Sequence, residues 1–197
     1  MKEFTIVRGL FDNRKRSLII GENSIKYENK DQKEDLFTVI KKEDIAGIRY
    51  GIHFIKGLEF YIGREYLIFI RDQSNKEIKI NFKLFYARKL NEKHQLYTEI
   101  VDEIWDNFIG DISQSYIEKF ESNESFNLAG IQIFNEKIKF GNNEIFIEDL
   151  EMKTYKHHFI IYSKTDNYKN KMLYYLKDKD AVILFDVLNN IITKESI

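Results

Sequence analysis

Short runs of alternating apolar and polar residues fill the first part of the chain. In residues 24–28, for example, Ile25 and Tyr27 fall on one face. Turn-forming residues separate the runs at intervals of roughly 8–12 positions, a spacing typical of an antiparallel barrel or sandwich. The predicted strands are 17–20, 24–28, 36–41, 48–54, 58–62, 66–71 and 77–82.

From about residue 91, the spacing between apolar residues changes from two positions to about four. Apolar side chains recur at every fourth position from Leu96 to Phe120, and a second row begins at Tyr97. Two adjacent rows form a broad helical stripe, and Gly110 costs such a helix only about 1 kcal/mol relative to alanine. We expect one long helix, or two abutting helices, over residues 91–122. Four-residue spacing advances about 40° per step, so the two halves of the stripe can face different cores.

Strand patterns resume after this helix and end in a second amphipathic one, over residues 179–194, with Asp178 as a candidate N-cap. The later predicted strands are 130–134, 137–140, 144–147, 152–155, 159–163 and 171–176. Strands followed by one helix therefore occur twice. Ile25-Lys26-Tyr27 resembles Ile138-Lys139-Phe140, and Asp44-Ile45 matches Asp149-Leu150, although the second copy is shorter.

This arrangement resembles the bacterial pleckstrin-homology-like (PH-like) domain, present as a tandem pair. The resemblance rests on residues 19–27, on Lys42-Glu43-Asp44-Ile45 and on Ile48-Arg49-Tyr50-Gly51. It implies an α+β protein of two small antiparallel β-barrels or sandwiches, each closed by a C-terminal helix and joined by the long helix. The expected domains are residues 1–110 and a shorter 111–197. Domains of this family are typically binding modules for proteins, peptides or lipid head groups.

Composition narrows the chemistry. The 197 residues include no cysteine, which excludes disulfides, thiolate nucleophiles and cysteine-ligated metals. The 31 basic and 32 acidic side chains give a net charge of −1, so we expect no nucleic-acid partner. Residues 1–110 carry 20 basic and 18 acidic side chains, whereas 111–197 carry 11 and 14. If either part contacts an acidic partner, this asymmetry favours the first.

Targeting signals are missing from the sequence. Charged residues interrupt the first fifteen positions, and no apolar run approaches the roughly 18–20 residues that span a bilayer. We therefore expect a cytoplasmic protein without a transmembrane segment. The abundance of Lys, Ile, Asn, Phe and Tyr indicates an AT-rich, bacterial genome.

No catalytic constellation emerges, so we expect no enzyme, no metal and no cofactor. The histidines (His53, His94, His157 and His158) lack ligand spacing, because His157 and His158 are adjacent on a predicted strand and point to opposite faces. Gly51, Gly57 and Gly63 lie between strand patterns, where hairpin turns explain them better than a phosphate loop. The carboxylates Asp102, Glu103 and Asp106 fit a solvated helix face.

One basic cluster is a candidate ligand site: Arg8, Arg14, Lys15 and Arg16. Resemblance to the family implies a role in holding phosphorylated head groups, and the arginine fork suits phosphate. The alternative is a solvated turn that keeps a sheet edge from pairing.

The leading hypothesis is a non-enzymatic scaffold that acts through protein–protein contacts, with an unknown partner or by self-association as a homo-oligomer. The alternative is a peripheral binder of anionic lipid or phosphorylated ligands through the basic cluster.

Overall fold

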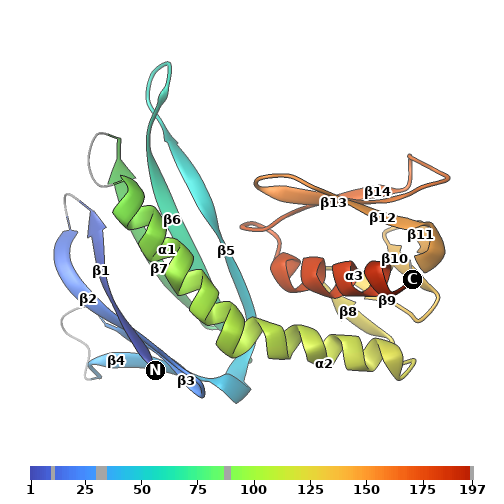
Figure 1. Ribbon diagram of the computed structural model, residues 1–197, viewed down its shortest axis with the longest axis horizontal. Coiled ribbons are helices and arrows are strands. Elements are labelled where there is room, and N and C mark those ends of the chain that lie inside the picture. Colours follow the sequence, from blue (N-terminus) through green and yellow to red (C-terminus); the bar gives the residue numbers. More distant parts are fainter. Residues whose placement is uncertain (10–11, 30–34, 87–89, 196–197) are drawn as a thin grey trace. The chain divides into compact units, whose positions relative to one another are not determined.

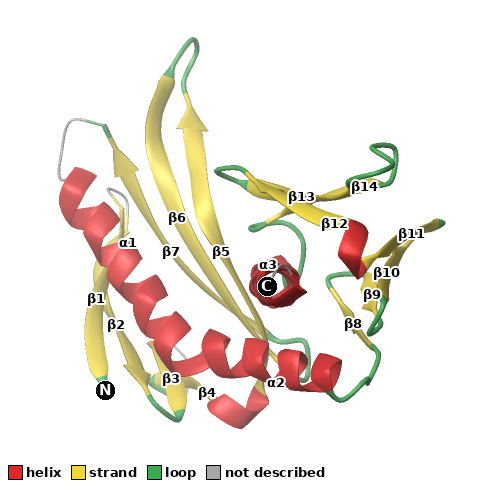
Figure 2. Cartoon of the chain, turned by 45° about the vertical axis from the view of Figure 1, so that its right-hand side comes forward, coloured by secondary structure: helices red, strands yellow, loops and turns green. Residues whose placement is uncertain are grey.

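The chain divides into two units, Met1–Ile109 and Gly110–Ile197. The computed structural model describes residues 1–9, 12–29, 35–86 and 90–195. Within each unit, a four-stranded antiparallel sheet precedes a three-stranded antiparallel sheet, and a helix follows (Figures 1 and 2). The order of elements in the first unit is thus repeated in the second.

The described residues of the first unit form seven strands. Its four-stranded sheet has the order β1 (Lys2–Gly9), β2 (Asp12–Gly21), β3 (Ser24–Glu28), β4 (Phe37–Lys41). A 3₁₀ turn, η1 (Lys42–Asp44), leads into the order β5 (Ile45–Lys56), β6 (Tyr61–Asp72), β7 (Glu77–Phe85). Helix α1 (Leu90–Ile104) and the π-helical segment η2 (Trp105–Ile109) complete the unit.

Strict alternation on β7 defines the core of this unit. Ile78, Ile80 and Phe82 are buried, and each faces a buried residue of β6 across the ladder. Helix α1 adds the buried side chains of Tyr97, Ile100, Val101 and Ile104. Each fully buried aliphatic or aromatic side chain contributes roughly 1.5–3 kcal/mol. The strands, with apolar residues at every second position, and the helix, with apolar residues at about every fourth, thus bury their apolar faces together.

A lysine lies where the two sheets of the first unit meet. Strands β1 and β7 are neighbours, yet the ladders among the described residues do not pair them. The Lys93 ammonium instead donates to the carbonyl oxygens of Val7, at 3.2 Å, and Lys83, at 3.0 Å. A side chain therefore satisfies backbone acceptors that a continuous ladder would have used.

The second unit begins with α2 (Gly110–Glu121) and ends with α3 (Ala181–Glu195). Its four-stranded sheet has the order β11 (Asn143–Phe146), β10 (Lys137–Phe140), β9 (Ile131–Ile133), β8 (Phe126–Leu128). After the 3₁₀ turn η3 (Ile147–Asp149), its three-stranded sheet has the order β12 (Leu150–Thr154), β13 (His158–Ser163), β14 (Asn170–Tyr174). The Lys171 ammonium donates to the Gly130 carbonyl at 3.1 Å, again linking the two sheets of the unit.

The prediction of two small β-barrels or sandwiches, each closed by a C-terminal helix and joined by the long helix, is wrong. The described residues form four separate sheets, and none of the four closes on itself. Alternating burial shows which face of a strand is inside, but it carries no information on whether distant strands exchange hydrogen bonds. Nothing in the structure identifies a PH-like domain as such, so that resemblance stays a prediction.

Both predicted helical regions are confirmed. Helical residues run without a break from Leu90 to Glu121, against the expected 91–122, and the final helix covers Ala181–Glu195. Asp178 does not cap this helix in the expected way, because its carboxylate accepts the backbone N–H of Tyr174 at 2.7 Å. The π-helical residues surround Asn107, whose side-chain amide donates to the Glu103 carbonyl at 2.8 Å.

Three strand predictions need correction, and one of them is β8 (Phe126–Leu128), which was not predicted. Residues 2–9 form β1, which the sequence analysis missed, and the predicted strand 58–62 is largely the turn between β5 and β6. Gly63, read as a turn signal, lies inside β6. A Cβ there would come within 2.3 Å of the Leu84 carbonyl oxygen, so glycine permits the close approach of two strands.

Candidate functional site: an exposed hairpin tip

Strands β5 and β6 extend beyond the third strand of their sheet. Gly63 pairs with Phe85 near the end of β7, and the Tyr86 N–H donates to the Ile62 carbonyl at 2.9 Å. Past this point, the described ladder pairs the two strands with each other, and a 2.7 Å hydrogen bond from Gly57 N–H to the Phe60 carbonyl closes the turn. The hairpin therefore projects from its own sheet (Figure 1).

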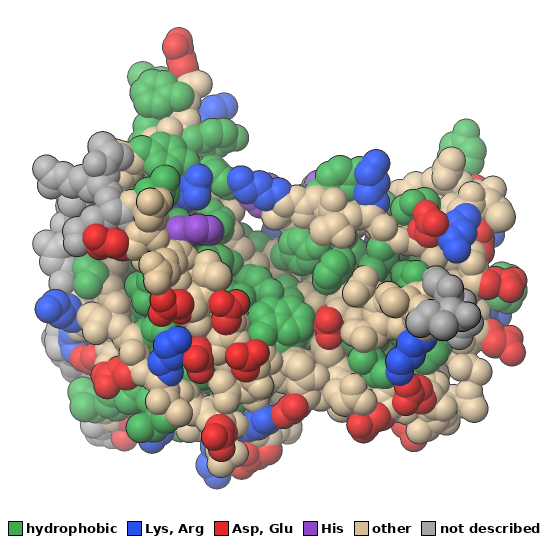
Figure 3. All heavy atoms as spheres, viewed as in Figure 1, with side chains coloured by type: hydrophobic (Ala, Val, Ile, Leu, Met, Phe, Trp, Pro, Cys, Tyr) green, Lys and Arg blue, Asp and Glu red, His purple; other side chains and the backbone are tan. Residues whose placement is uncertain are grey.

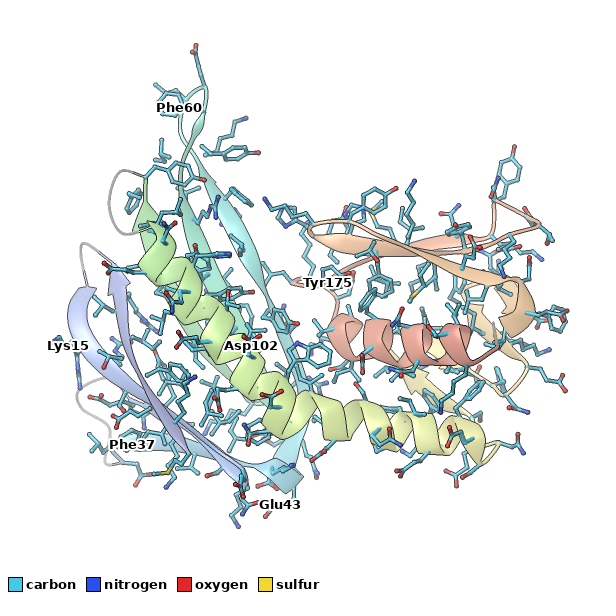
Figure 4. The ribbon with its side chains drawn as sticks, in the orientation of Figure 1. Lys15, Phe37, Glu43, Phe60, Asp102 and Tyr175 are labelled. Atoms are coloured by element: carbon cyan, nitrogen blue, oxygen red, sulfur yellow. The ribbon has the colours of Figure 1, made fainter. Side chains whose placement is uncertain are left out.

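Large apolar side chains stand on this projection. Leu58 is fully exposed, Phe60 is 70% exposed and Tyr61 is 57% exposed. Hydrophobic side chains gather over the end of the hairpin, and an acidic side chain caps them (Figure 3). Phe60 points outward from the turn (Figure 4). A cluster of exposed large apolar residues marks an interaction surface more often than a lone one does.

Aromatic and cationic contacts hold the base of the tip. The Arg64 guanidinium lies 5.3 Å from the ring centroid of Phe54 and 5.8 Å from that of Tyr86. Its Nε donates to the Tyr86 hydroxyl at 3.3 Å, a bond that raises the pKa of Arg64. The rings of Phe54 and Tyr61 meet edge to face at 5.5 Å. These contacts limit the freedom of the hairpin base, which lowers the entropic cost of binding.

Charges of both signs flank the apolar residues. Lys56 ends β5, and Glu59 sits in the turn between Leu58 and Phe60; both are exposed. We define the docking tip as Lys56, Leu58, Glu59, Phe60 and Tyr61. This tip was not predicted, because Leu58 and Phe60 match the pattern of a strand over residues 58–62. Both side chains are exposed because these residues form the hairpin turn instead.

The structure distributes the predicted basic cluster over β1 and β2. Arg8 lies on β1, and Arg14, Lys15 and Arg16 lie on β2. Because successive strand residues point to opposite faces, Lys15 faces away from Arg14 and Arg16. Arg16 is only 5% exposed, whereas Lys15 is exposed (Figure 4). The four side chains therefore do not converge on one surface.

Glu28 is an internal partner for part of this cluster. Its carboxylate accepts the Ser17 N–H at 2.8 Å and the Arg14 guanidinium at 3.0 Å. The Ser17 bond first, and then Arg14, lower the pKa of Glu28 below its ordinary 4.5. An anionic ligand at Arg14 would have to compete with this carboxylate. Ligand binding by the cluster stays a prediction.

The other candidates from sequence lie apart from the tip. His53 approaches Glu65 at 3.8 Å on the outer face of β5 and β6. Glu103 pairs with Lys2 at 3.3 Å, and Asp102 is exposed on α1 (Figure 4). Among the residues that the structure describes, no three histidine or carboxylate side chains are arranged to hold a metal ion. No helix of the described chain is long and apolar enough to cross a membrane.

No protein-family model matches the chain, and a search of curated proteins finds no match.

Proposed function

We propose that this protein is a non-catalytic scaffold that acts through protein–protein contacts, and that its docking tip binds the docking tip of a second copy. The observation that carries this proposal is the exposure of Leu58, Phe60 and Tyr61 on a projecting hairpin. We propose the cytoplasm as its compartment, in keeping with a sequence that contains no cysteine.

The charges on the docking tip favour a second copy of this chain as its binding partner. A two-fold interface brings residue i of one copy to residue j of the other, and j to i. Glu59 of each tip can therefore face Lys56 of the other while the apolar side chains pack between them. The acidic Glu59 at the apex disfavours the alternative of insertion into an anionic membrane.

The exposed apolar area of the tip sets the expected affinity of self-association. Phe and Tyr side chains bury roughly 150–250 Å² each when fully covered. At the observed exposures, and with Leu58 added, each tip offers on the order of 400 Å² of apolar surface. A pair of tips then buries about 800 Å², within the range of weak, transient interfaces. We expect a dissociation constant on the order of 10–100 μM.

Sedimentation velocity over a concentration series from about 5 to 500 μM, spanning that constant, tests the proposal. The weight-average mass should rise above the 23.7 kDa monomer with concentration. The Leu58→Ser/Phe60→Ser variant should remain monomeric. Tyr168→Ser, a matched control at a 95% exposed aromatic residue of the second unit, should associate like the wild type.

Exchanging the two charges tests whether Lys56 of one copy faces Glu59 of the other. Lys56→Glu and Glu59→Lys should each weaken association, because like charges then face each other across the two-fold axis. The double variant Lys56→Glu/Glu59→Lys should restore it. A wild type that stays monomeric at every concentration, or a Leu58→Ser/Phe60→Ser variant that associates normally, would overturn the proposal.

The anionic-ligand alternative makes a separable prediction. Co-sedimentation with phosphatidylserine vesicles should then depend on Arg8 and Lys15 and fall as salt rises. Loss of vesicle binding in the tip variant, with no self-association in the wild type, would instead show that a membrane occupies the tip.

A further inference from the structure

A row of two lysines, two tyrosines and one histidine crosses the three-stranded sheet of the second unit. The His158 ring stacks on Tyr155 at 4.7 Å and lies 5.3 Å from Tyr174 on its other side. The Lys153 ammonium lies 5.6 Å from the centre of the Tyr155 ring, and the Lys177 ammonium 4.8 Å from that of Tyr174. We call these five residues the lysine–tyrosine ladder.

Strand register places the ladder on the outer face of the sheet. His158 pairs with Tyr174, and its neighbour Phe159 is buried against Phe185 of α3. Because side chains alternate between faces, His158 points away from α3. The turn after β12 is closed by a hydrogen bond from Tyr155 N–H to the His158 carbonyl at 2.9 Å. The ladder therefore rests on paired strands and a closed turn.

Positive charge is concentrated here within an otherwise acidic unit. Residues 152–160 contain two lysines and no acid, whereas residues 111–197 carry 14 acidic and 11 basic side chains. Burial first, and then Lys156 and His158, lower the pKa of His157 beside the ladder, which favours its neutral form, so the lysines supply the positive charge. Glu151 and Asp178, the nearest acids in sequence, accept hydrogen bonds from the Tyr162 hydroxyl and the Tyr174 N–H.

We infer that the lysine–tyrosine ladder is a docking surface for an acidic segment of a partner protein. Its ammonium, phenol and imidazole groups can donate hydrogen bonds. Hydrogen bonds from the positively charged ammonium groups to carboxylates are among the strong ones. The ladder crosses three strands spaced about 4.8 Å apart, so an extended peptide spans its width in about three residues. A segment with carboxylates on alternate residues presents them on one face, toward both lysines.

Two other polyanions fit the surface less well. Single-stranded nucleic acid binds largely by stacking its bases on open aromatic faces, whereas rings or ammonium groups already lie against the tyrosine rings of the ladder. Anionic membranes bind clusters of four to eight basic residues, more than the two lysines of the ladder. The ladder shares no residue with the docking tip, so this inference does not depend on self-association.

Fluorescence anisotropy with a labelled hexaglutamate peptide tests the inference, using the full chain at low salt. Binding should weaken as salt rises. The Lys153→Glu/Lys177→Glu variant should bind at least about tenfold more weakly. Lys119→Glu/Lys164→Glu changes the net charge equally at two exposed lysines of the same unit, and should change affinity less than about twofold.

Three results would overturn the inference. The first is no measurable peptide binding at low salt. The second is equal weakening by the two double variants, because the effect would then follow net charge alone. The third is tighter binding of a hexathymidine oligonucleotide or of phosphatidylserine vesicles than of hexaglutamate, which would assign the ladder to that ligand. Circular dichroism of both double variants should match the wild type, so that a folding defect is not read as lost binding.

Discussion

Gly63 provides a stringent test of how the docking tip is supported. It lies in β6 opposite Phe85, where β7 ends and the free part of the hairpin begins. A Cβ at this position would meet the Leu84 carbonyl oxygen at 2.3 Å, and the Leu84 carbonyl carbon and Phe85 Cα at 3.2 Å. All three are backbone atoms in a paired strand, so they cannot move aside as a side chain would.

We expect Gly63→Ala to destabilise the first unit by about 2–3 kcal/mol, the upper part of the range for overpacking. Removing the clash requires separating β6 from β7 at this end, which breaks the last ladder contacts. In a unit of about this size, 1 kcal/mol shifts Tm by roughly 4–8 °C. The expected shift is therefore a decrease of roughly 10–20 °C.

The single tryptophan makes the assay specific to this unit. Trp105 donates to the Tyr50 hydroxyl at 2.6 Å within the first unit, so its fluorescence should report unfolding there. Urea titration followed at this signal gives the free energy of unfolding.

Gly21→Ala is the matched control. Its Cβ would meet nothing closer than 3.7 Å, and the change should be neutral or stabilising by up to about 1 kcal/mol. If Gly63→Ala unfolds at the same urea concentration as Gly21→Ala, the close-approach argument is wrong.

Two further predictions concern ionic contacts of the first unit. The folded-state pKa of Glu28 lies below its ordinary 4.5, so its contribution to stability is present above the unfolded-state pKa and is lost as pH falls through the folded-state pKa. Urea titrations from pH 7 to about 3 should therefore show a smaller loss of stability for Glu28→Gln than for the wild type; equal losses would contradict this. Lys93→Met removes the ammonium that bonds Val7 and Lys83 and should cost about 0.5–1.5 kcal/mol. Hydrogen exchange should then be faster in β1 and β7 than in the wild type, with β3 unchanged; uniform exchange would refute a local role at the sheet junction.

The helices were the most predictable part of the chain. The four-residue rows from Leu96 to Phe120 appear as α1, η2 and α2, with bounds within one residue of those expected. Tyr97, Ile100 and Ile104 from these rows are buried. A helix is closed by bonds between residues four apart, so a local window contains most of the information that defines it.

Strand bounds were less predictable where glycine or charged residues interrupted the alternating apolar pattern. Gly63 suggested a turn but serves a close approach between strands. Phe4 and Ile6 alternate with polar residues as a strand does, but the charged residues on either side of them weaken the strand pattern, and β1 was not predicted. Because the first predicted strand began at residue 17, Arg14 and Arg16 were expected to precede the sheet, although they form part of β2.

The sequence by itself determined the secondary structure classes, their repeated order and the absence of thiol chemistry, because these follow from local periodicity and composition. Only the tertiary structure decided that the sheets stay open, that Arg14 bonds Glu28, and that Leu58 and Phe60 project without cover. The ladder likewise joins Lys153 to Lys177 across three strands. Each of these features depends on which distant segments meet and in what register, and a one-residue change of register would turn every side chain of a strand to its other face.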